Sequence, residues 1–286
     1  AVLAIGAGFA LAPITHFRHP LVLAVVLASS SAAVALPVLR ERNTTGPSVV
    51  ALTAWIAAAD VAAVLAIPLV LPAASISRSV LGGLIVITVT ALVYLVARAT
   101  NHTPVIGSLR RQSRDRGWAL DLRASLALLF ALAWIANRFG TSVLIAGFAV
   151  GVLITLLGEP RRVALQLIGV AEGFFVPLFF VDLGARLDLR GFLADRHAVL
   201  LACAVVLGAM LVHVAAARIW RLPVGSGLAA SAQLGVPSAI ASIGLQLGTL
   251  TPAQASALMA AAVGSLALCA IGAGMLGRST PIGDHA

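Results

Sequence analysis

Asp60 is the residue of this sequence whose surroundings most clearly point to chemistry, because it stands alone in an apolar run. The run, Val49–Leu71, is long enough to cross a lipid bilayer and carries no other ionisable side chain. A charge at the bilayer centre costs about 2.5–3.5 kcal/mol on insertion scales, so a carboxylate there is usually protonated or bound to a cation. Asp60 is therefore predicted to hold a proton or a cation in turn. A structural hydrogen bond to another helix is the alternative.

Three consecutive serines, Ser29, Ser30 and Ser31, lie near the middle of the apolar run Leu21–Leu39. Serine hydroxyls compete with the helix for backbone hydrogen bonds. Pro37 follows, and a proline removes the partner of the carbonyl four residues before it. The pattern predicts a partly unwound helix, opened near Pro37, whose carbonyls and hydroxyls face an ion path. Small residues at a tight helix–helix contact are the alternative.

A second interrupted run, Gly225–Leu247, lies near the other end of the chain. Its middle contains residues that weaken a helix, namely Gln233, Gly235, Pro237 and Ser238. A simple proline kink would account for one such run. Breaks in two corresponding runs favour a second unwound helix.

His213 lies in the apolar run His197–Ala217 and is a candidate proton relay or partner for Asp60. An interfacial histidine near a helix end is the alternative. Asp182 precedes Arg186 by four residues, a spacing typical of a salt bridge on one helix face.

Composition fixes the class of protein around these residues. The chain of 286 residues is 60% hydrophobic and 10% charged, which excludes a soluble enzyme and intrinsic disorder. Its 19 cationic residues are all arginines, placed singly or in small groups between apolar runs, which argues against nucleic-acid binding. Cys203 and Cys269 lack metal-ligand spacing, and no nucleotide-binding or hydrolase motif is present. No enzyme activity, no cofactor and no metal beyond a transported monovalent cation are expected.

Ten apolar runs are candidates for membrane spans, so the sequence predicts an all-α polytopic membrane protein. They are Ala1–Ile14, Leu21–Leu39, Val49–Leu71, Val80–Ala97, Ala119–Asn137, Thr141–Leu157, Gly173–Leu187, His197–Ala217, Gly225–Leu247 and Ala253–Leu276. The polar stretch Arg98–Trp118 is expected to be a connector. Pro160–Glu172 is expected to be an interfacial helix that ends before the seventh span. The first run lacks a basic start and is expected to be cut short, so it is not a signal peptide.

Arginine placement predicts the orientation of these spans. Loops with even numbers, counted along the chain and including the C-terminal tail, carry more arginines than loops with odd numbers. The even loops are therefore expected to be cytoplasmic. The first three spans then run opposite to the last three, which is the inverted-repeat arrangement of many secondary transporters.

The motifs resemble those of a known family. ASSSAAVALPVLRERN is similar to the unwound fourth helix of the cation:proton antiporter-2 superfamily, especially its potassium-efflux (Kef-type) branch of sodium–proton exchanger membrane domains. AADVAAVLAIPLVL resembles the following helix, FFVPLFFVDLGARLDL the stretch before the last three core helices, and SAQLGVPSAIASIGLQL the second unwound helix.

The resemblance implies an inverted-repeat antiporter fold with two crossed, discontinuous helices. It divides the chain into core repeat one (1–72), linker and dimerisation-side spans (73–196), core repeat two (197–277) and a tail (278–286), with the family's first two helices missing. Asp60 matches the family's essential aspartate. Electrogenic sodium members have a second aspartate where Ala59 stands, and a lysine near the position of Met210, whereas this chain has no lysine. That difference fits electroneutral exchange or a potassium-type member.

The expected function is therefore K⁺ or Na⁺ exchange for H⁺ by alternating access in a multi-pass inner-membrane protein, as a homodimer in the lipid bilayer. Asp60 would bind proton and cation in turn, with Ser29, Ser30, Ser31 and the open backbone near Pro37 completing the site. Two alternatives stay open. One is a sodium-coupled organic-anion symporter of related fold, which should need more polar side chains around the crossing. The other is a channel-like or transport-dead membrane subunit.

Overall fold

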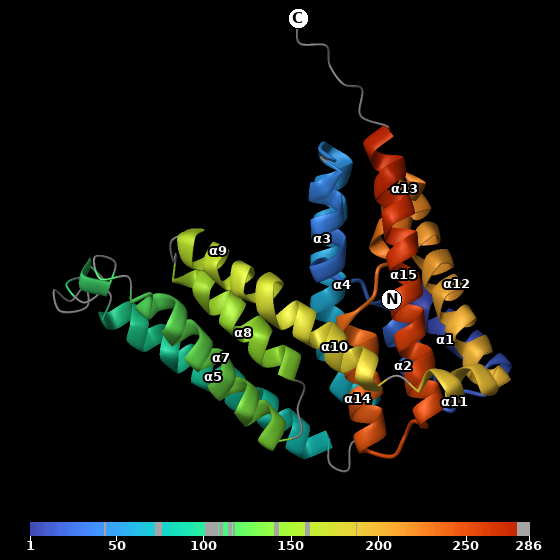
Figure 1. Cartoon of the computed structure of the whole chain (residues 1–286), viewed down its shortest axis with the longest axis horizontal. Helices are drawn as coiled ribbons and strands as arrows, with labels where there is room; N and C mark the ends of the chain where they lie inside the picture. Colours follow the sequence, from blue (N-terminus) through green and yellow to red (C-terminus); the bar gives the residue numbers. More distant parts are fainter. Residues whose placement is uncertain are drawn as a thin grey trace, which may run out of the picture. The chain divides into compact units, whose positions relative to one another are not determined.

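The computed structural model describes residues 1–42, 44–71, 76–100, 108, 111–113, 116, 118–139, 143–157, 161–186 and 188–278. All regular structure in these ranges is helical (Figure 1). Helices satisfy every backbone hydrogen bond within one segment, which long apolar runs require in lipid. The predicted all-α class is confirmed.

The chain divides into two compact units, each described here by itself. Unit 1 comprises Ala1–Pro72 and Arg186–Ala286, and unit 2 comprises Ala73–Ala185. The helices of unit 1 are α1 (Val2–Ile14), α2 (Pro20–Ala28), α3 (Ala32–Glu41), α4 (Pro47–Val70), α11 (Leu189–Ala194), α12 (Arg196–Ile219), α13 (Val224–Ala230), α14 (Gly235–Gln246) and α15 (Pro252–Arg278). Those of unit 2 are α5 (Ile76–Thr100), α7 (Leu120–Arg138), α8 (Val143–Leu156), α9 (Arg161–Val170), a π-helical turn (Ala171–Phe175) and α10 (Val176–Arg186).

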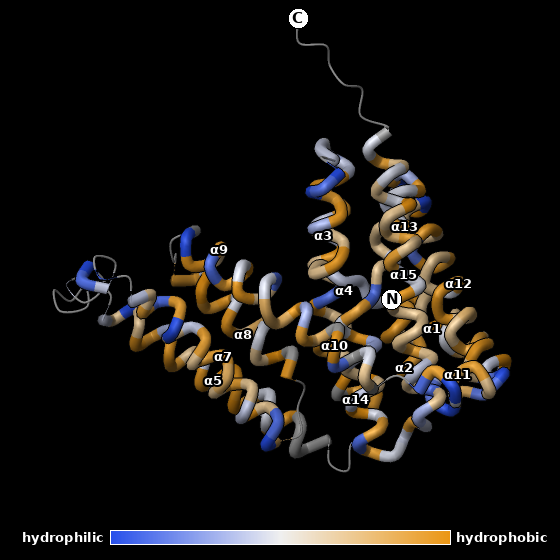
Figure 2. The backbone as a smooth tube through the Cα atoms, viewed as in Figure 1, coloured by the Kyte–Doolittle hydropathy of each residue, from blue (hydrophilic) through white to orange (hydrophobic). Residues whose placement is uncertain are grey.

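Eight helical segments of the described residues are long and apolar enough to cross a bilayer, and two shorter apolar helices, Val2–Ile14 and Ile145–Leu156, accompany them. Together they account for the ten predicted runs. Two of the eight, Pro20–Glu41 and Val224–Gln246, each consist of two helices separated by a short non-helical segment. Apolar colour dominates the helices, and polar residues gather toward their ends (Figure 2).

The predicted boundary before the seventh span is wrong. The chain stays helical from α9 through the π-helical turn into α10, so Glu172 and Gly173 lie inside one continuous helical segment. A π-helical turn inserts one extra residue without ending the helix. The side chain of Arg186, the predicted partner of Asp182, lies outside the described residues.

Loops of unit 1 meet in pairs at its two ends. The ring of His16, between α1 and α2, contacts that of His197 at the start of α12, with 4.6 Å between centroids. At the opposite end of these helices, a side chain built on Gly277 near the end of α15 would lie 3.7 Å from Thr44, which follows α3. The odd-numbered loops one and seven therefore share one end, and the end of α15 lies with the residues after α3 at the other. Within this unit the first and last triplets of spans run in opposite directions.

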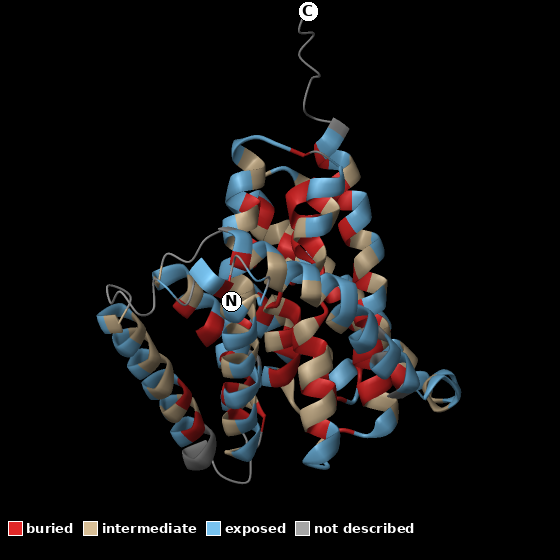
Figure 3. Cartoon of the chain, turned by 60° about the vertical axis from the view of Figure 1, so that its left-hand side comes forward, coloured by how far each residue is buried: buried red, intermediate tan, exposed pale blue. Residues whose placement is uncertain are grey.

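Helix α4 is the element that joins the two interrupted helices, because it packs against all four of their halves, α2, α3, α13 and α14. Helix α15 packs against α3, α12, α13 and α14. Buried residues gather inside the bundle while outward faces are exposed (Figure 3). Exposed large side chains such as Leu65, Leu69, Leu207 and Leu211 are expected where lipid replaces water.

Backbone-to-backbone contact fixes α13 against its neighbours. A Cβ atom at Gly272 of α15 would lie 2.5 Å from the Ala229 nitrogen and 2.6 Å from the Gly225 oxygen. A Cβ atom at Gly227 would lie 2.6 Å from the Cα atom of Val214 in α12. Small residues allow this approach, as in many membrane helix pairs.

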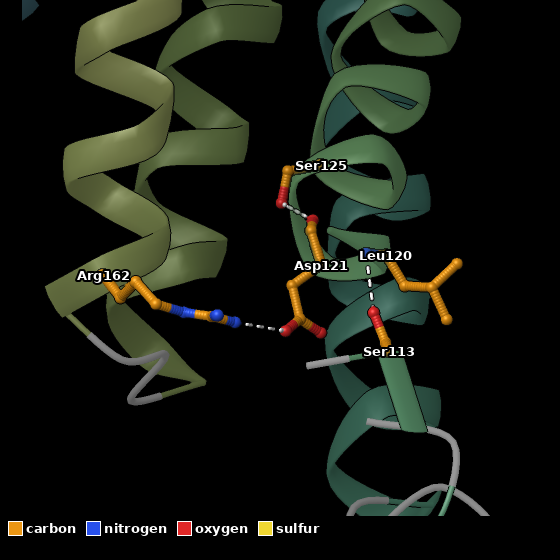
Figure 4. A network of polar contacts seen from close by, with 5 residues as sticks. All are labelled: Ser113, Leu120, Asp121, Ser125 and Arg162. Atoms are coloured by element: carbon orange, nitrogen blue, oxygen red, sulfur yellow. Dashed lines mark hydrogen bonds and ion pairs between the residues drawn. The ribbon is translucent and has the colours of Figure 1, made fainter. Parts of the chain in front are cut away.

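Unit 2 carries a polar network at the N-terminal ends of α7 and α9 (Figure 4). Arg162 Nη2 lies 3.7 Å from Asp121 Oδ2, Ser125 donates to the Asp121 carbonyl at 2.8 Å, and Leu120 N–H donates to Ser113 Oγ at 3.1 Å. The ion pair places the starts of α7 and α9 at the same end of the unit.

Candidate functional site

The first break is the segment Ser29–Ser31, between α2 and α3. Ser29 and Ser31 both have extended backbone, with φ and ψ of −71° and 149° and of −122° and 109°. All three serines are buried, each at most 4% exposed. The predicted opening at Pro37 is wrong, because Pro37 lies inside α3. A proline removes only one helical hydrogen bond there, whereas the serines offer the backbone alternative partners.

The second break is Ser231–Leu234, between α13 and α14. Gln233 lies within it and is 1% exposed. Gly235, Pro237 and Ser238 instead form the first turn of α14, so the predicted break extends too far along the chain. Proline fits this turn because the first N–H groups of a helix have no intrahelical acceptor.

The two breaks exchange hydrogen bonds. Ser30 of the first break donates from Oγ to the Ala230 carbonyl, the last of α13, at 2.7 Å. Gln233 of the second break donates from Nε2 to the Val26 carbonyl, in the last turn of α2, at 2.5 Å. Each break therefore supplies a side-chain donor to a carbonyl in the last turn of the helix that precedes the other break.

The last four carbonyls of α13 all receive a donor. Gly227 accepts from Ser231 N, Leu228 from Ser231 Oγ, Ala229 from Ala232 N and Ala230 from Ser30 Oγ. At the end of α2, the Val26 carbonyl accepts from Ser29 N–H, Ser29 Oγ and Gln233. Among the hydrogen bonds of the described residues, the carbonyls of Leu27 and Ala28 receive none.

The C-terminal ends of α2 and α13 differ in how many of their carbonyls lack a donor. Carbonyl oxygens without donors in an apolar interior cost free energy unless something replaces water. The first break offers two such oxygens, and the second offers none at the end of α13. A cation is the kind of ligand that open carbonyls and hydroxyls can hold.

Asp60, a residue of α4, contacts the chain at the end of the first break. Its Oδ2 atom accepts a hydrogen bond from the backbone N–H of Ala32, the first residue of α3, at 3.3 Å. The side chain is half-buried, and no cationic side chain of the described residues pairs with it. The N-terminal end of a helix favours a negative charge. The N–H group that Asp60 binds belongs to the residue directly after Ser31, the last residue of the first break.

The three serines differ in what their hydroxyls already do. Those of Ser29 and Ser30 donate to carbonyls. The Ser31 hydroxyl has no hydrogen bond among the described contacts and does not cap α3, although Ser31 precedes the N–H group that Asp60 binds. Among the three serines, Ser31 is therefore the one whose hydroxyl makes no hydrogen bond in the described part of the chain, and it directly precedes the N–H group that Asp60 accepts.

His213 of α12 is 2% exposed and lies against Trp55 of α4. Its ring stacks on Trp55 with 5.6 Å between centroids, and its Nδ1 lies 2.9 Å from the Ala209 carbonyl. A carbonyl can only accept, so Nδ1 carries the proton and Nε2 of the neutral ring can receive one. No hydrogen bond joins His213 to Asp60 in the described part of the chain.

Sequence reasoning missed two residues of this region. Ser265 of α15 accepts from the Gln233 N–H at 2.9 Å, and a lone serine in an apolar helix is the signal that could have revealed it. Trp55, five residues before Asp60 on α4, stacks on His213 and contacts Trp220 edge-on at 5.2 Å. No group of three metal-ligating side chains occurs in the described ranges.

The sequence matches one family profile and is similar to two named proteins. The profile of the family described as "Sodium/hydrogen exchanger, transmembrane" matches residues 1–279. One relative is named "Putative Na(+)/H(+) antiporter YjbQ" and comes from Bacillus subtilis (strain 168). It is 27% identical over 179 residues, which are 60% of this chain and 28% of YjbQ. The high-affinity Na(+)/H(+) antiporter NhaS3 of Synechocystis sp. (strain PCC 6803) is 25% identical over 195 residues, 60% of this chain and 41% of NhaS3. The chain thus matches less than half the length of either relative.

Proposed function

Because this chain belongs to the sodium/hydrogen exchanger family of transmembrane domains, within the cation:proton antiporter superfamily, we propose that it exchanges a monovalent cation, Na⁺ or K⁺, for a proton across a membrane. The observation that carries the proposal is the placement of the Asp60 carboxylate beside an unwound segment with open carbonyls. The names of YjbQ and NhaS3 support Na⁺ as one such cation.

Competition at Asp60 is the proposed mechanism of coupling. A proton or a cation can neutralise the carboxylate, and each must leave before the other binds. We propose that Ser31 and the carbonyls of Leu27 and Ala28 provide further ligands, with Ser29 and Ser30 offering the lone pairs of hydroxyls already oriented by donation. Movement of the helices around this site would expose it to each side of the membrane in turn.

A single carboxylate without a basic partner supports electroneutral exchange of one cation for one proton. We further propose that the first and last three spans form the moving core, that the middle spans form the side of a homodimer, and that the protein lies in the inner cell membrane. The alternatives predict different behaviour, since a symporter would need an organic anion and a transport-dead subunit would move no protons.

The proposal is tested with the full chain in proteoliposomes that contain a trapped pH dye. Na⁺, K⁺ or Li⁺ is added outside, with protein-free vesicles as the control. At least one cation is expected to drive protons across the membrane, and clamping the membrane potential is expected to leave the rate unchanged. Protein-loaded vesicles that behave like empty ones with every cation would contradict the proposal.

Ser31→Ala is expected to raise the apparent KM for the cation about three- to tenfold, the effect of losing one neutral ligand oxygen. Its maximal rate and its unfolding temperature should stay near those of the wild type, because the Ser31 hydroxyl makes no cap to α3. Ser125→Ala in unit 2 removes a hydroxyl that donates within α7 and is the matched control. An unchanged KM would remove Ser31 from the ligand set.

The relay role of His213 stays a prediction, and His213→Phe tests it. Phenylalanine keeps a ring against Trp55 but carries no proton. If His213 relays protons, the exchange rate should fall about 100-fold, as for the loss of a general acid or base. His197→Phe, which keeps the ring contact with His16, is the control. A wild-type rate in His213→Phe would leave His213 as a packing residue.

A further inference from the structure

Gln233 lies where three elements meet, and its hydrogen bonds join them. Its backbone N–H donates to Ser265 Oγ of α15 at 2.9 Å, and its side-chain amide reaches the Val26 carbonyl at the end of α2. The Ser265 hydroxyl is itself held 2.6 Å from the Ala262 carbonyl. The backbone of Gln233, whose side-chain amide reaches Val26, is thus hydrogen-bonded to α15.

The carbonyl that Gln233 holds is the anchor of the first break. Val26 also accepts from the N–H and the hydroxyl of Ser29, the residue at which the chain leaves helical geometry. Three residues later, the Ala32 N–H meets Asp60. The position of the Val26 carbonyl therefore sets where the extended segment begins and where it meets the carboxylate.

We propose that Gln233 is a positioning residue for the ion site, an inference that rests on the proposed cation:proton exchange. It acts through Val26 by holding the first break so that the Ala32 N–H and the open carbonyls face Asp60. Ser30 supports the same arrangement from the other direction through Ala230. Gln233 itself supplies a donor, so it does not ligate the cation through that amide nitrogen.

The chemistry of the donor makes a specific test available. Gln233→Glu replaces the amide by a carboxyl, which can donate to the Val26 carbonyl only while it is protonated. Relative to the wild type at each pH, its exchange rate is expected to be near normal at acidic pH and to fall about tenfold or more at alkaline pH. Gln233→Leu, which has no donor, should raise the KM for the cation at every pH.

Gln246→Glu is the matched control, because Gln246 is an exposed residue in the last turn of α14, the helix that follows the second break. It makes the same chemical change away from Val26 and should follow the wild-type pH profile. A Gln233→Glu profile that coincides with that of the control would overturn the positioning role.

A second measurement separates this proposal from the transport function. Hydrogen–deuterium exchange of the peptide that covers Ser29–Ala35 is compared between the wild type and Gln233→Leu, with Ser30→Ala as a second variant. Both changes are expected to speed exchange of this peptide about tenfold, since each removes one bond between the breaks. Unchanged exchange overturns the positioning role whether or not the wild type transports. Faster hydrogen exchange in both variants, together with a wild type that moves no ions, would keep the positioning role of Gln233 and reject antiport.

Discussion

Asp60→Asn is expected to abolish cation-driven proton movement, with a loss of at least about 100-fold, while the protein stays folded. Asparagine has nearly the same shape and can still accept the Ala32 N–H bond through its amide oxygen. It can neither bind a proton in the relevant pH range nor carry the negative charge that attracts a cation. The measurement is dye quenching in proteoliposomes, with folding checked by thermal unfolding in detergent.

Asp182→Asn provides the same chemical change on α10 in unit 2 and should transport like the wild type. Asp60→Glu is informative in addition, because it keeps the charge but lengthens the side chain by one carbon atom. Partial activity with an altered KM would support direct binding at this position. Wild-type exchange in Asp60→Asn would refute the one-carboxylate mechanism.

Gly272→Ala is expected to be the most destabilising single methyl addition in unit 1. The new carbon would lie 2.5 Å from the Ala229 nitrogen, 2.6 Å from the Gly225 oxygen and 2.7 Å from the Leu228 Cβ. Two of these three atoms belong to backbone, which cannot swing aside as a flexible side chain can. Overpacking of this kind costs about 1–3 kcal/mol.

The consequence of Gly272→Ala should extend beyond stability. If α13 moves away from α15, the Ala230 carbonyl moves with it, and the Ser30 hydroxyl loses its acceptor. Exchange and unfolding temperature should therefore fall together. Gly274→Ala is the control two residues along the same helix, since a Cβ there meets nothing within 4 Å. Equal melting temperatures for the two variants would show that α13 and α15 do not pack this closely.

Much of this fold could be predicted because bilayer physics acts locally. Ten apolar runs sufficed to predict the helices, and a charge isolated in one of them sufficed to single out Asp60. The sequence does not predict the continuous helix through Gly173, because the polar residues of Pro160–Glu172 indicate an interfacial helix, whereas a π-helical turn joins α9 to α10.

The positions of the breaks could be predicted only in part. Pro37 and Pro237 do not mark the breaks, because each lies within a helix and a proline's effect depends on its place there. The breaks are instead held by Ser30 and Gln233, whose acceptors lie 200 and 207 residues away in sequence. Local patterns carry no signal for such pairs. The close packing of Gly272 and the stacking of Trp55 on His213 depend on the same long-range assembly.

The long separation of these hydrogen-bonded pairs also bears on how the protein is made. Val26 and Gln233 are 207 residues apart, and all of unit 2 lies between them. At ribosomal rates of about 5–20 residues per second, roughly 10–40 s pass between the synthesis of the carbonyl and that of its donor. During that time the first three spans lack the two hydrogen bonds that join the first break to the second. The nascent protein therefore depends on water, lipid headgroups or the insertion machinery to shelter this helix end until the last spans arrive.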